Sequence, residues 1–206
     1  MVNLSAKYRW GAFILVAFIG WQWGSAGWIW GKAHLGQWLI AQAWDHTLAQ
    51  PDQIHKPWPW ADTWPVARLQ IPARGIDLYI LEGVQGNSLA FGPGHQQGTP
   101  QPGQGLSVIG GHRDTHFRFL AEVQPGEKLI LQVPTGNHLH YRIDRLEVVD
   151  SRHHALQIPT SESGLLLITC YPFHGLTTGP LRLLVWAQGE VPLAARLPAA
   201  SAIHID

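Results

Sequence analysis

The chain has 206 residues, with 14 Lys and Arg balanced by 14 Asp and Glu. This length allows one domain with a sizeable core plus an appendage, and the balanced charge provides no basic face for nucleic acid, so we expect no nucleic-acid partner. The single cysteine excludes an internal disulfide, and 15 prolines and 22 glycines between short apolar runs favour an all-β domain over a helical bundle.

The N-terminal part of the chain has a different composition from the rest. Ten of the 11 tryptophans lie in residues 1–64, and the segment Trp10–Trp30 contains 21 residues without a charge. That length is close to the ~20 residues that cross a bilayer as a helix, and tryptophan is favoured at the membrane interfaces. The segment therefore predicts a single transmembrane helix that holds the protein in the membrane.

Charged residues on either side of this segment predict its orientation. Lys7 and Arg9 precede it, whereas only Lys32 follows closely. The bias puts the N-terminus in the cytoplasm and the remaining chain on the extracytoplasmic, periplasmic side of the cytoplasmic (inner) membrane. A cleaved signal peptide and an interfacial helix are the alternatives to an uncleaved signal anchor. The first fits less well because Ser25-Ala26-Gly27 is a poor cleavage site.

Residues 33–50 are compatible with a continuing helix, in which Leu35, Trp38, Leu39 and Trp44 lie near one face. Three prolines in the segment Lys56–Pro65, "KPWPWADTWP", then end helical structure. We therefore expect four segments. They are a cytoplasmic stub with the signal anchor (1–32), a juxtamembrane helix and Pro/Trp-rich linker (33–64), the β-domain (65–190) and a C-terminal tail (191–206).

From Pro65 onward, short apolar runs alternate with Gly- and Pro-rich turns. The predicted strands are Val66–Ile71, Ile76–Glu82, Leu106–Ile109, Lys128–Val133, Leu139–Val149 (with room for a bend into two), Leu165–Thr169 and Leu181–Ala187. Seven or eight such strands indicate a closed barrel or a sandwich. The segment 86–105 has too much glycine and proline for a strand, and we expect a short helix at Ser88–Phe91 followed by a loop.

The only cysteine ends one of these strands, in "LLLITCYPF" (Leu165–Phe173). A strand end exposes a thiol at the rim of a barrel while the strand fixes its backbone, as a catalytic group requires. The plain alternative is a small buried apolar residue. A thiol nucleophile also needs a base, and His112 follows another apolar strand in "SVIGGHRDTHF" (Ser107–Phe117). If these strand ends are adjacent, His112 and Cys170 meet.

A third candidate is Arg182, which begins the strand after Cys170 and lies among leucines in "GPLRLLVWAQ" (Gly179–Gln188). Burying an arginine is costly unless it is paired, so its side chain either reaches the rim or has an anionic or carbonyl partner. Beside a nucleophile, a planar fork of N–H donors suits a developing oxyanion.

Together, "GHRDTHF", "LLLITCYPF" and an arginine early in the next strand resemble the sortases, the membrane-anchored cysteine transpeptidases of bacterial surfaces. The resemblance covers about 65–188. The "PWPWADTWPVARL" arm and the short chain are most similar to the class GN sortases of Gram-negative bacteria. One residue departs from the family pattern, because Leu166 stands where the first Thr of Thr-Leu-x-Thr-Cys is usual.

The resemblance implies an eight-stranded sortase-like β-barrel with short helices. Cys170 would be the nucleophile, His112 the general acid/base and Arg182 the group that positions the oxyanion or substrate. Thr169 would add a hydroxyl donor, and Asp114 would either orient the His112 loop or cap a local turn. The implied reaction cleaves a Leu-Pro-x-Thr-Gly-like sorting signal of a protein substrate between Thr and Gly. It gives a thioacyl enzyme that an unidentified amine acceptor resolves.

We expect no cofactor and no metal. Some sortases bind calcium through clustered carboxylates, but the acids here are scattered among the strands: Glu122, Glu127, Asp144, Glu147 and Asp150. His112 and His116 have a spacing of four, but a zinc-site Glu between them is missing.

Two other functions remain open. One is a cysteine hydrolase, or a peptidoglycan L,D-transpeptidase, although that family places His-Gly directly before its cysteine and this chain has Ile168-Thr169 there. The other is a non-catalytic, membrane-anchored β-domain that binds peptide.

Overall fold

The computed structural model describes residues 6–86, 88–153, 164–175 and 179–190. The chain divides into two compact units, Met1–Leu39 and Ile40–Asp206. The predicted C-terminal tail, 191–206, lies outside the described residues. The other predicted segment boundaries stay predictions.

The first unit consists of most of helix α1 (Ala6–Ala49), which continues without a break through the predicted span. Its large apolar side chains are exposed, with Trp21 and Trp23 at 75% and 78%. Within the part of the chain that the structure describes, α1 alone is long and apolar enough to cross a membrane, with a mean hydropathy of 1.4 in an 18-residue window of Tyr8–Ala49. An N-terminal signal sequence has the same features, so an uncleaved signal anchor and a cleaved signal peptide both remain open.

The second unit begins with the last turns of α1. Ile40 and Trp44 are four residues apart and share one buried face, as helical periodicity requires. The indole Nε1 of Trp44 donates a hydrogen bond of 3.3 Å to Oε1 of Gln132 in β5. Of the side chains predicted to share a face, Trp44 is therefore packed, whereas Leu35 and Trp38 are 54% and 58% exposed.

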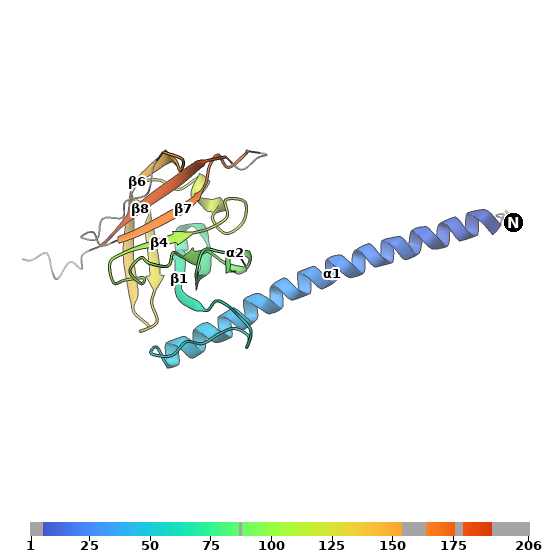
Figure 1. Ribbon diagram of the computed structural model, residues 1–206, viewed down its shortest axis with the longest axis horizontal. Coiled ribbons are helices and arrows are strands. Elements are labelled where there is room, and N and C mark those ends of the chain that lie inside the picture. Colours follow the sequence, from blue (N-terminus) through green and yellow to red (C-terminus); the bar gives the residue numbers. More distant parts are fainter. Residues whose placement is uncertain (1–5, 87, 154–163, 176–178, 191–206) are drawn as a thin grey trace, which may run out of the picture. The chain divides into compact units, whose positions relative to one another are not determined.

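Eight strands then close a barrel in the order β1-β2-β3-β4-β7-β8-β6-β5 (Figure 1). Two neighbouring pairs are parallel, β2 with β3 and β4 with β7, and the others are antiparallel. The strands are β1 (Pro65–Ile71), β2 (Ile76–Glu82), β3 (Gly94–His95), β4 (Leu106–Gly110), β5 (Lys128–Gln132), β6 (His138–Asp150), β7 (Gly164–Cys170) and β8 (Leu181–Gly189). The short helices are η1 (Pro72–Arg74), α2 (Ser88–Phe91) and η2 (Arg118–Ala121). The predicted eight-stranded barrel with short helices is confirmed.

The prediction of a strand-free segment at 86–105 is wrong, because β3 lies within it. This strand has two residues, and it joins β2 to β4 and so completes the barrel. A Cβ atom on Gly94 would lie 2.0 Å from the carbonyl oxygen of Gly83, so only glycine allows the two backbones to approach this closely. Long β6 is one strand, with a register shift against β8 between Ile143 and Arg145 where the sequence left room for a bend.

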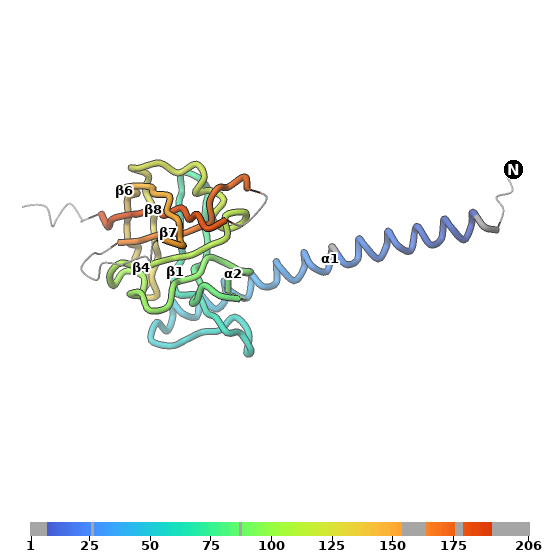
Figure 2. Tube along the Cα trace, turned by 45° about the horizontal axis from the view of Figure 1, so that its top comes forward, coloured from blue at the N-terminus to red at the C-terminus, as the bar shows by residue number. Residues whose placement is uncertain are grey.

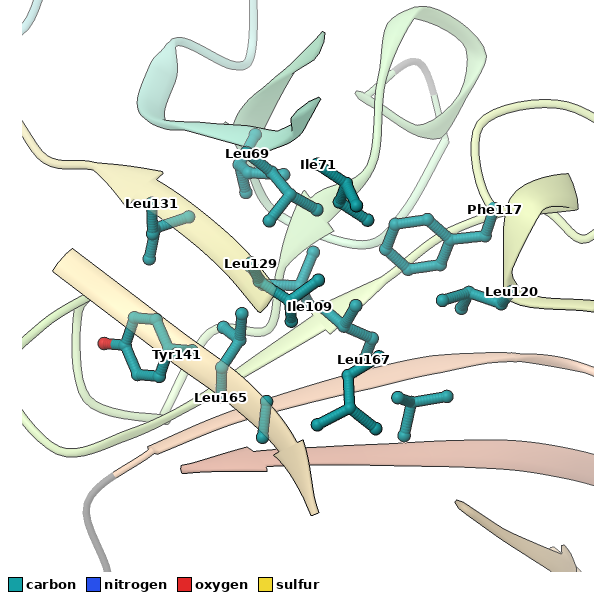
Figure 3. Packing of buried hydrophobic residues seen from close by; sticks show 14 of the residues in the cluster. Leu69, Ile71, Ile109, Phe117, Leu120, Leu129, Leu131, Tyr141, Leu165 and Leu167 are labelled. Carbon is teal, nitrogen blue, oxygen red and sulfur yellow. The ribbon is translucent and has the colours of Figure 1, made fainter. Parts of the chain in front are cut away.

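Side chains alternate between the inside and the outside of the barrel, as strand geometry dictates. The interior core contains Leu165 and Leu167 of β7, packed with residues such as Ile109 and Phe117 (Figure 3). A second group of buried apolar side chains, here called the outer cluster, includes the intervening residue Leu166. Its buried members are Leu106, Val108, Leu166, Leu184 and Trp186. This alternation decides which residues at the end of β7 face outward.

Candidate active site

Cys170 is the last residue of β7, and its side chain is half-buried. Cys170 and Leu166 of the outer cluster are four residues apart in the strand, so both side chains point to the outer face of the barrel. The side chain of the preceding residue, Thr169, points to the inner face and is 2% exposed. The strand therefore buries the threonine and leaves the thiol accessible at the barrel end where β4 and β7 both finish. We call this end the site rim.

Arg182 lies directly across from Cys170 in the antiparallel pairing of β7 with β8. Its side chain is half-buried, and Nη1 donates hydrogen bonds to the carbonyl oxygens of Gly179 (2.7 Å) and Leu181 (2.9 Å). Of the alternatives that the sequence left open for this arginine, the structure shows carbonyl partners. The register places the two residues opposite one another, and the bonds from Nη1 hold the guanidinium against the local backbone.

His112 reaches the same rim from the other side of β7. The parallel pairing of β4 with β7 places Gly110 opposite Ile168, and His112 and Cys170 each follow these partners by two positions. Gly111 extends the connection, because its N–H donates to the carbonyl oxygen of Ile168 at 3.1 Å. Strands β4, β7 and β8 lie side by side (Figure 2), so β7 carries the thiol between the histidine and the arginine.

The loop that carries His112 is anchored by Phe117, which is fully buried in the interior core. The N–H of Phe117 donates to the carbonyl oxygen of His112 at 3.0 Å, and this bond closes a tight turn. The ring of Phe117 packs over Gly111 so closely that a Cβ atom there would lie 2.7 Å from it. The glycine before His112 is therefore needed for contact between the loop and the core.

The electrostatics of this loop involve a second histidine. Burial lowers the pKa of His116 from its ordinary value of 6.5, and the positive charge of protonated His112 lowers this pKa further. The two imidazoles therefore interact electrostatically, although His116 lies four residues along the turn from His112. His112 itself is exposed, as a proton donor and acceptor for a substrate must be.

Asp114, the other predicted member of this loop, is 70% exposed in its side chain. Its Oδ1 lies 3.4 Å from Nε of Arg113. The hydroxyl of Thr169 donates a hydrogen bond of 2.8 Å to the carbonyl oxygen of Gly111, beside His112. In the described contacts, the threonine rather than the aspartate binds the backbone that carries the histidine.

Arg113 is a residue of the site that the sequence reasoning missed. Its side chain is 6% exposed, and its guanidinium donates to the carbonyl oxygens of Pro172 (2.7 Å) and Gly175 (2.6 Å). It therefore ties the loop after His112 to the segment after Cys170. The only available signal was its place directly after the candidate histidine in "GHRDTHF", and the carbonyl partners have no signature in the sequence.

The acids that were considered for calcium binding are partly engaged by arginines. Arg74 pairs with both Glu122 and Glu127, and Arg152 pairs with Asp150. Across residues 6–86, 88–153, 164–175 and 179–190, no three His, Cys, Asp or Glu side chains form a group that suits a metal ion. The expected absence of a metal stays a prediction.

A thiol, an imidazole and a guanidinium are thus carried by three adjacent strands at one rim. Such a set supplies a nucleophile, a proton shuttle and a group of donors for an oxyanion, which are the components of acyl transfer through a cysteine. None of these components requires a cofactor. These are the three residues that the sequence singled out, and their catalytic roles stay predictions.

Comparison with known proteins identifies the family. The pattern described as "Sortase domain" matches residues 69–190, which cover β8 and its candidate arginine as well as the strands of the thiol and the histidine. A curated relative, Sortase D of Bacillus subtilis (strain 168), is 32% identical over 122 residues. The matched residues make up 58% of this chain and 61% of the relative, so the chain spans about three fifths of that protein's length.

Solved structures agree with this match. Sortase A from Corynebacterium diphtheriae is 29% identical, with a TM-score of 0.55 and coverage of 67% of each chain. A Clostridium perfringens Sortase D5 transpeptidase is 20% identical, with a TM-score of 0.60 and coverage of 77% of this chain and 99% of the other. At that identity the second likeness concerns the fold alone. Because the family pattern covers more than half of the chain and includes all three candidate residues, the chain belongs to the sortase family.

Proposed function

We propose that this protein is a membrane-anchored cysteine transpeptidase that cleaves a Leu-Pro-x-Thr-Gly-like sorting signal and transfers the acyl group to an amine. The observation that carries the proposal is the position of Cys170 at a strand end, paired with Arg182 on one side and level with His112 on the other. Membership of the sortase family supports the same reaction class. Formally the enzyme is a thiol protease, a cysteine endopeptidase of the hydrolase class, whose acyl-enzyme is resolved by an amine.

In the first half-reaction, Cys170 gives its thiol proton to His112, and the sulfur attacks the threonine carbonyl carbon of the signal. A C–S bond forms, and the carbonyl electrons move to the oxygen. The N–H donors of Arg182 stabilise this oxyanion, because its Nη1 bonds to the backbone hold the fork in place before the reaction. The intermediate then breaks the Thr–Gly C–N bond, and protonated His112 gives its proton to the leaving amine of glycine.

In the second half-reaction, an acceptor amine attacks the thioester carbon. His112 removes a proton from the attacking amine, and the thiolate of Cys170 leaves as the new amide forms. A thioester is activated toward amines, so the energy of the cleaved peptide bond is conserved in the new amide bond. The partners are thus a protein that bears the sorting signal and a molecule that presents a free amine.

The proposal includes a location, which rests on α1 and its flanking charges. The excess of positive charge before α1 supports a cytoplasmic N-terminus and a barrel on the periplasmic side of the inner membrane. The exposed apolar side chains of the first unit support insertion in lipid. The Trp- and Pro-rich arm before β1 supports assignment to the class GN sortases, which we include in the proposal.

The test is mass spectrometry of the full-length protein in detergent with a library of sorting-signal pentapeptides. We expect a thioacyl adduct on Cys170, absent from Cys170→Ala, and an amide product when triglycine is added as the acceptor. His112→Ala should lower turnover by roughly 10²- to 10⁴-fold, the usual contribution of general acid/base catalysis.

Two other results would each point to a different function. Cleavage without transfer to any amine would make the protein a cysteine hydrolase of the same fold. The barrel is a non-catalytic binding domain if no adduct forms with any peptide and if Cys170 is alkylated at the same rate in the wild type and in His112→Ala.

A further inference from the structure

Two hydrogen-bonded links bracket the pair formed by His112 and Cys170. The first lies before both residues, where the hydroxyl of Thr169 donates to the carbonyl oxygen of Gly111 at 2.8 Å. The second lies after both residues, where Arg113 donates to main-chain carbonyls that follow the cysteine. The backbone on each side of the histidine is thus tied to the backbone on the corresponding side of the cysteine.

The second link consists of a single buried cation. The side chain of Arg113 is 6% exposed, and a buried charge is costly unless hydrogen-bond partners compensate for the lost water. Nη1 donates to the carbonyl oxygen of Pro172 at 2.7 Å, and Nη2 donates to that of Gly175 at 2.6 Å. The planar guanidinium directs its N–H bonds along fixed lines, so one side chain spans two carbonyls of the same turn.

The position of His112 depends on ties of this kind. It lies beyond the end of β4 in an exposed turn, where no strand ladder fixes its backbone. Its immediate neighbour Arg113 points into the protein and binds the connection between β7 and β8, the segment that starts directly after Cys170. A movement of the histidine turn away from the nucleophile would break both of these bonds.

We propose that Arg113 is a positioning residue that holds His112 in reach of Cys170, an inference that rests on the roles given to this pair in the proposed function. Arg113 does not contact the substrate in this scheme. Its effect on the rate passes through the histidine, because displacing a catalytic group by about 1 Å can cost on the order of 10²-fold in rate. A residue that contributed only to folding would change the rate by the same factor with or without His112.

The decisive variant is Arg113→Lys in the full-length protein in detergent. Lysine keeps the positive charge, but its single ammonium cannot reproduce the fixed fork across two carbonyls. We expect kcat for pentapeptide cleavage to fall by about 10- to 100-fold, while KM stays close to that of the wild type. Unchanged kcat would overturn the proposal.

The matched control is Arg74→Lys, at another arginine that donates to a main-chain carbonyl. Nη2 of Arg74 bonds to the carbonyl oxygen of Glu122 at 2.6 Å, and its fork pairs with Glu127. We expect this variant to keep the wild-type kcat. An equal fall in kcat in both variants would show a general effect of replacing an arginine that bonds to the main chain, and it too would overturn the proposal.

A double-mutant cycle separates positioning from a merely structural role. If Arg113 acts through the histidine, Arg113→Lys should change the residual rate of His112→Ala by less than about twofold. A loss in that background as large as the loss in the wild-type background would overturn the proposal. This measurement requires only that His112→Ala, alone and combined with Arg113→Lys, remains folded, which circular dichroism checks.

A peptide-free measurement keeps the inference separate from the proposed reaction. The rate of Cys170 alkylation by iodoacetamide, followed across pH, responds to an imidazole held beside the thiol. We expect the profile of Arg113→Lys to move toward that of His112→Ala, and the profile of Arg74→Lys to match the wild type. A wild-type profile for Arg113→Lys would overturn the inference even if the wild-type enzyme cleaves sorting peptides. If no peptide is cleaved, the proposed function fails, and the alkylation profiles still decide the role of Arg113.

Discussion

Thr169 and Gly111 are joined by a hydrogen bond of 2.8 Å from the threonine hydroxyl to the glycine carbonyl oxygen. The bond links β7, one residue before its cysteine, to the chain one residue before His112, and the threonine is 2% exposed. It therefore gives the barrel a polar contact directly beneath the candidate site. Its removal should affect both stability and turnover.

We expect Thr169→Val to lower the free energy of unfolding by about 1–3 kcal/mol, because valine keeps the shape but leaves the carbonyl of Gly111 without its donor. Peptide turnover should fall as well, since the backbone before His112 loses a tie. Urea unfolding and a cleavage assay measure the two effects. Thr169→Ser, which keeps the hydroxyl, should retain most of the turnover, and equal turnover in both variants would contradict a role for the hydrogen bond.

Cys170→Ala should leave the barrel folded and abolish both peptide cleavage and adduct formation. The cysteine is half-buried at a strand end, so replacing its sulfur by hydrogen removes little packing. Intact-protein mass spectrometry and circular dichroism check the two halves of this prediction. Substantial residual cleavage would assign the nucleophile to another residue.

Arg182→Lys separates charge from geometry at the other side of the thiol. If the arginine stabilises the oxyanion with N–H donors in fixed directions, lysine should lower turnover by at least roughly tenfold, since one lost donor of this kind costs on the order of 10²–10³ in rate. Alkylation of Cys170 by iodoacetamide should change little, because the charge remains. Equal losses in turnover and alkylation would mean instead that Arg182 serves to stabilise the thiolate.

Gly111→Ala should displace the histidine turn. The added Cβ would lie 2.7 Å from the ring of buried Phe117, and overpacking of this kind costs about 1–3 kcal/mol. We expect lower thermal stability and at least tenfold lower turnover, roughly the cost of a displaced catalytic group. The matched control is Gly189→Ala at the end of β8, where the nearest atom to a new Cβ, on Tyr141, is 4.0 Å away. Similar losses at both glycines would rule out a specific effect at the turn.

The pH dependence of stability should contain a contribution from His116. Its pKa in the folded protein is lowered, mainly by burial, so the unfolded chain takes up this proton at a higher pH than the fold does. The stability that depends on a neutral His116 is complete above the ordinary pKa of 6.5 and is lost as the pH falls through the lowered folded value. The urea midpoint should therefore fall less between about pH 7.5 and pH 5 in His116→Gln than in the wild type. An equal fall in the two proteins would contradict this assignment.

Much of the barrel is readable from the sequence because its strands are short apolar runs between glycines and prolines. Ile76–Glu82 and the helix Ser88–Phe91 have the predicted bounds. Strand β3 was not predictable in this way, because two residues have no periodicity. The reason for Gly94 is a close approach to Gly83, and such an approach exists only in three dimensions.

The same distinction applies to the site. Cys170, His112 and Arg182 were identifiable because each lies at an end of an apolar strand, where a polar or reactive side chain is unusual. Arg113 was not, since its partners Pro172 and Gly175 lie 59 and 62 residues away and contribute only carbonyl oxygens, which every residue has. Sequence patterns reveal groups with distinctive chemistry, whereas bonds to the main chain appear only with the fold.

The parallel pairing of β4 with β7 also bears on how the protein folds. Helix η2 and strands β5 and β6 lie between these two strands in the sequence, so the pair forms only after a long segment of chain has been looped out and ordered. Under the proposed function, a chain that has not yet added β7 to the sheet would hold the histidine apart from the thiol. Chemical competence would then arise together with barrel closure, so that a partly folded chain would not cleave the sorting peptide.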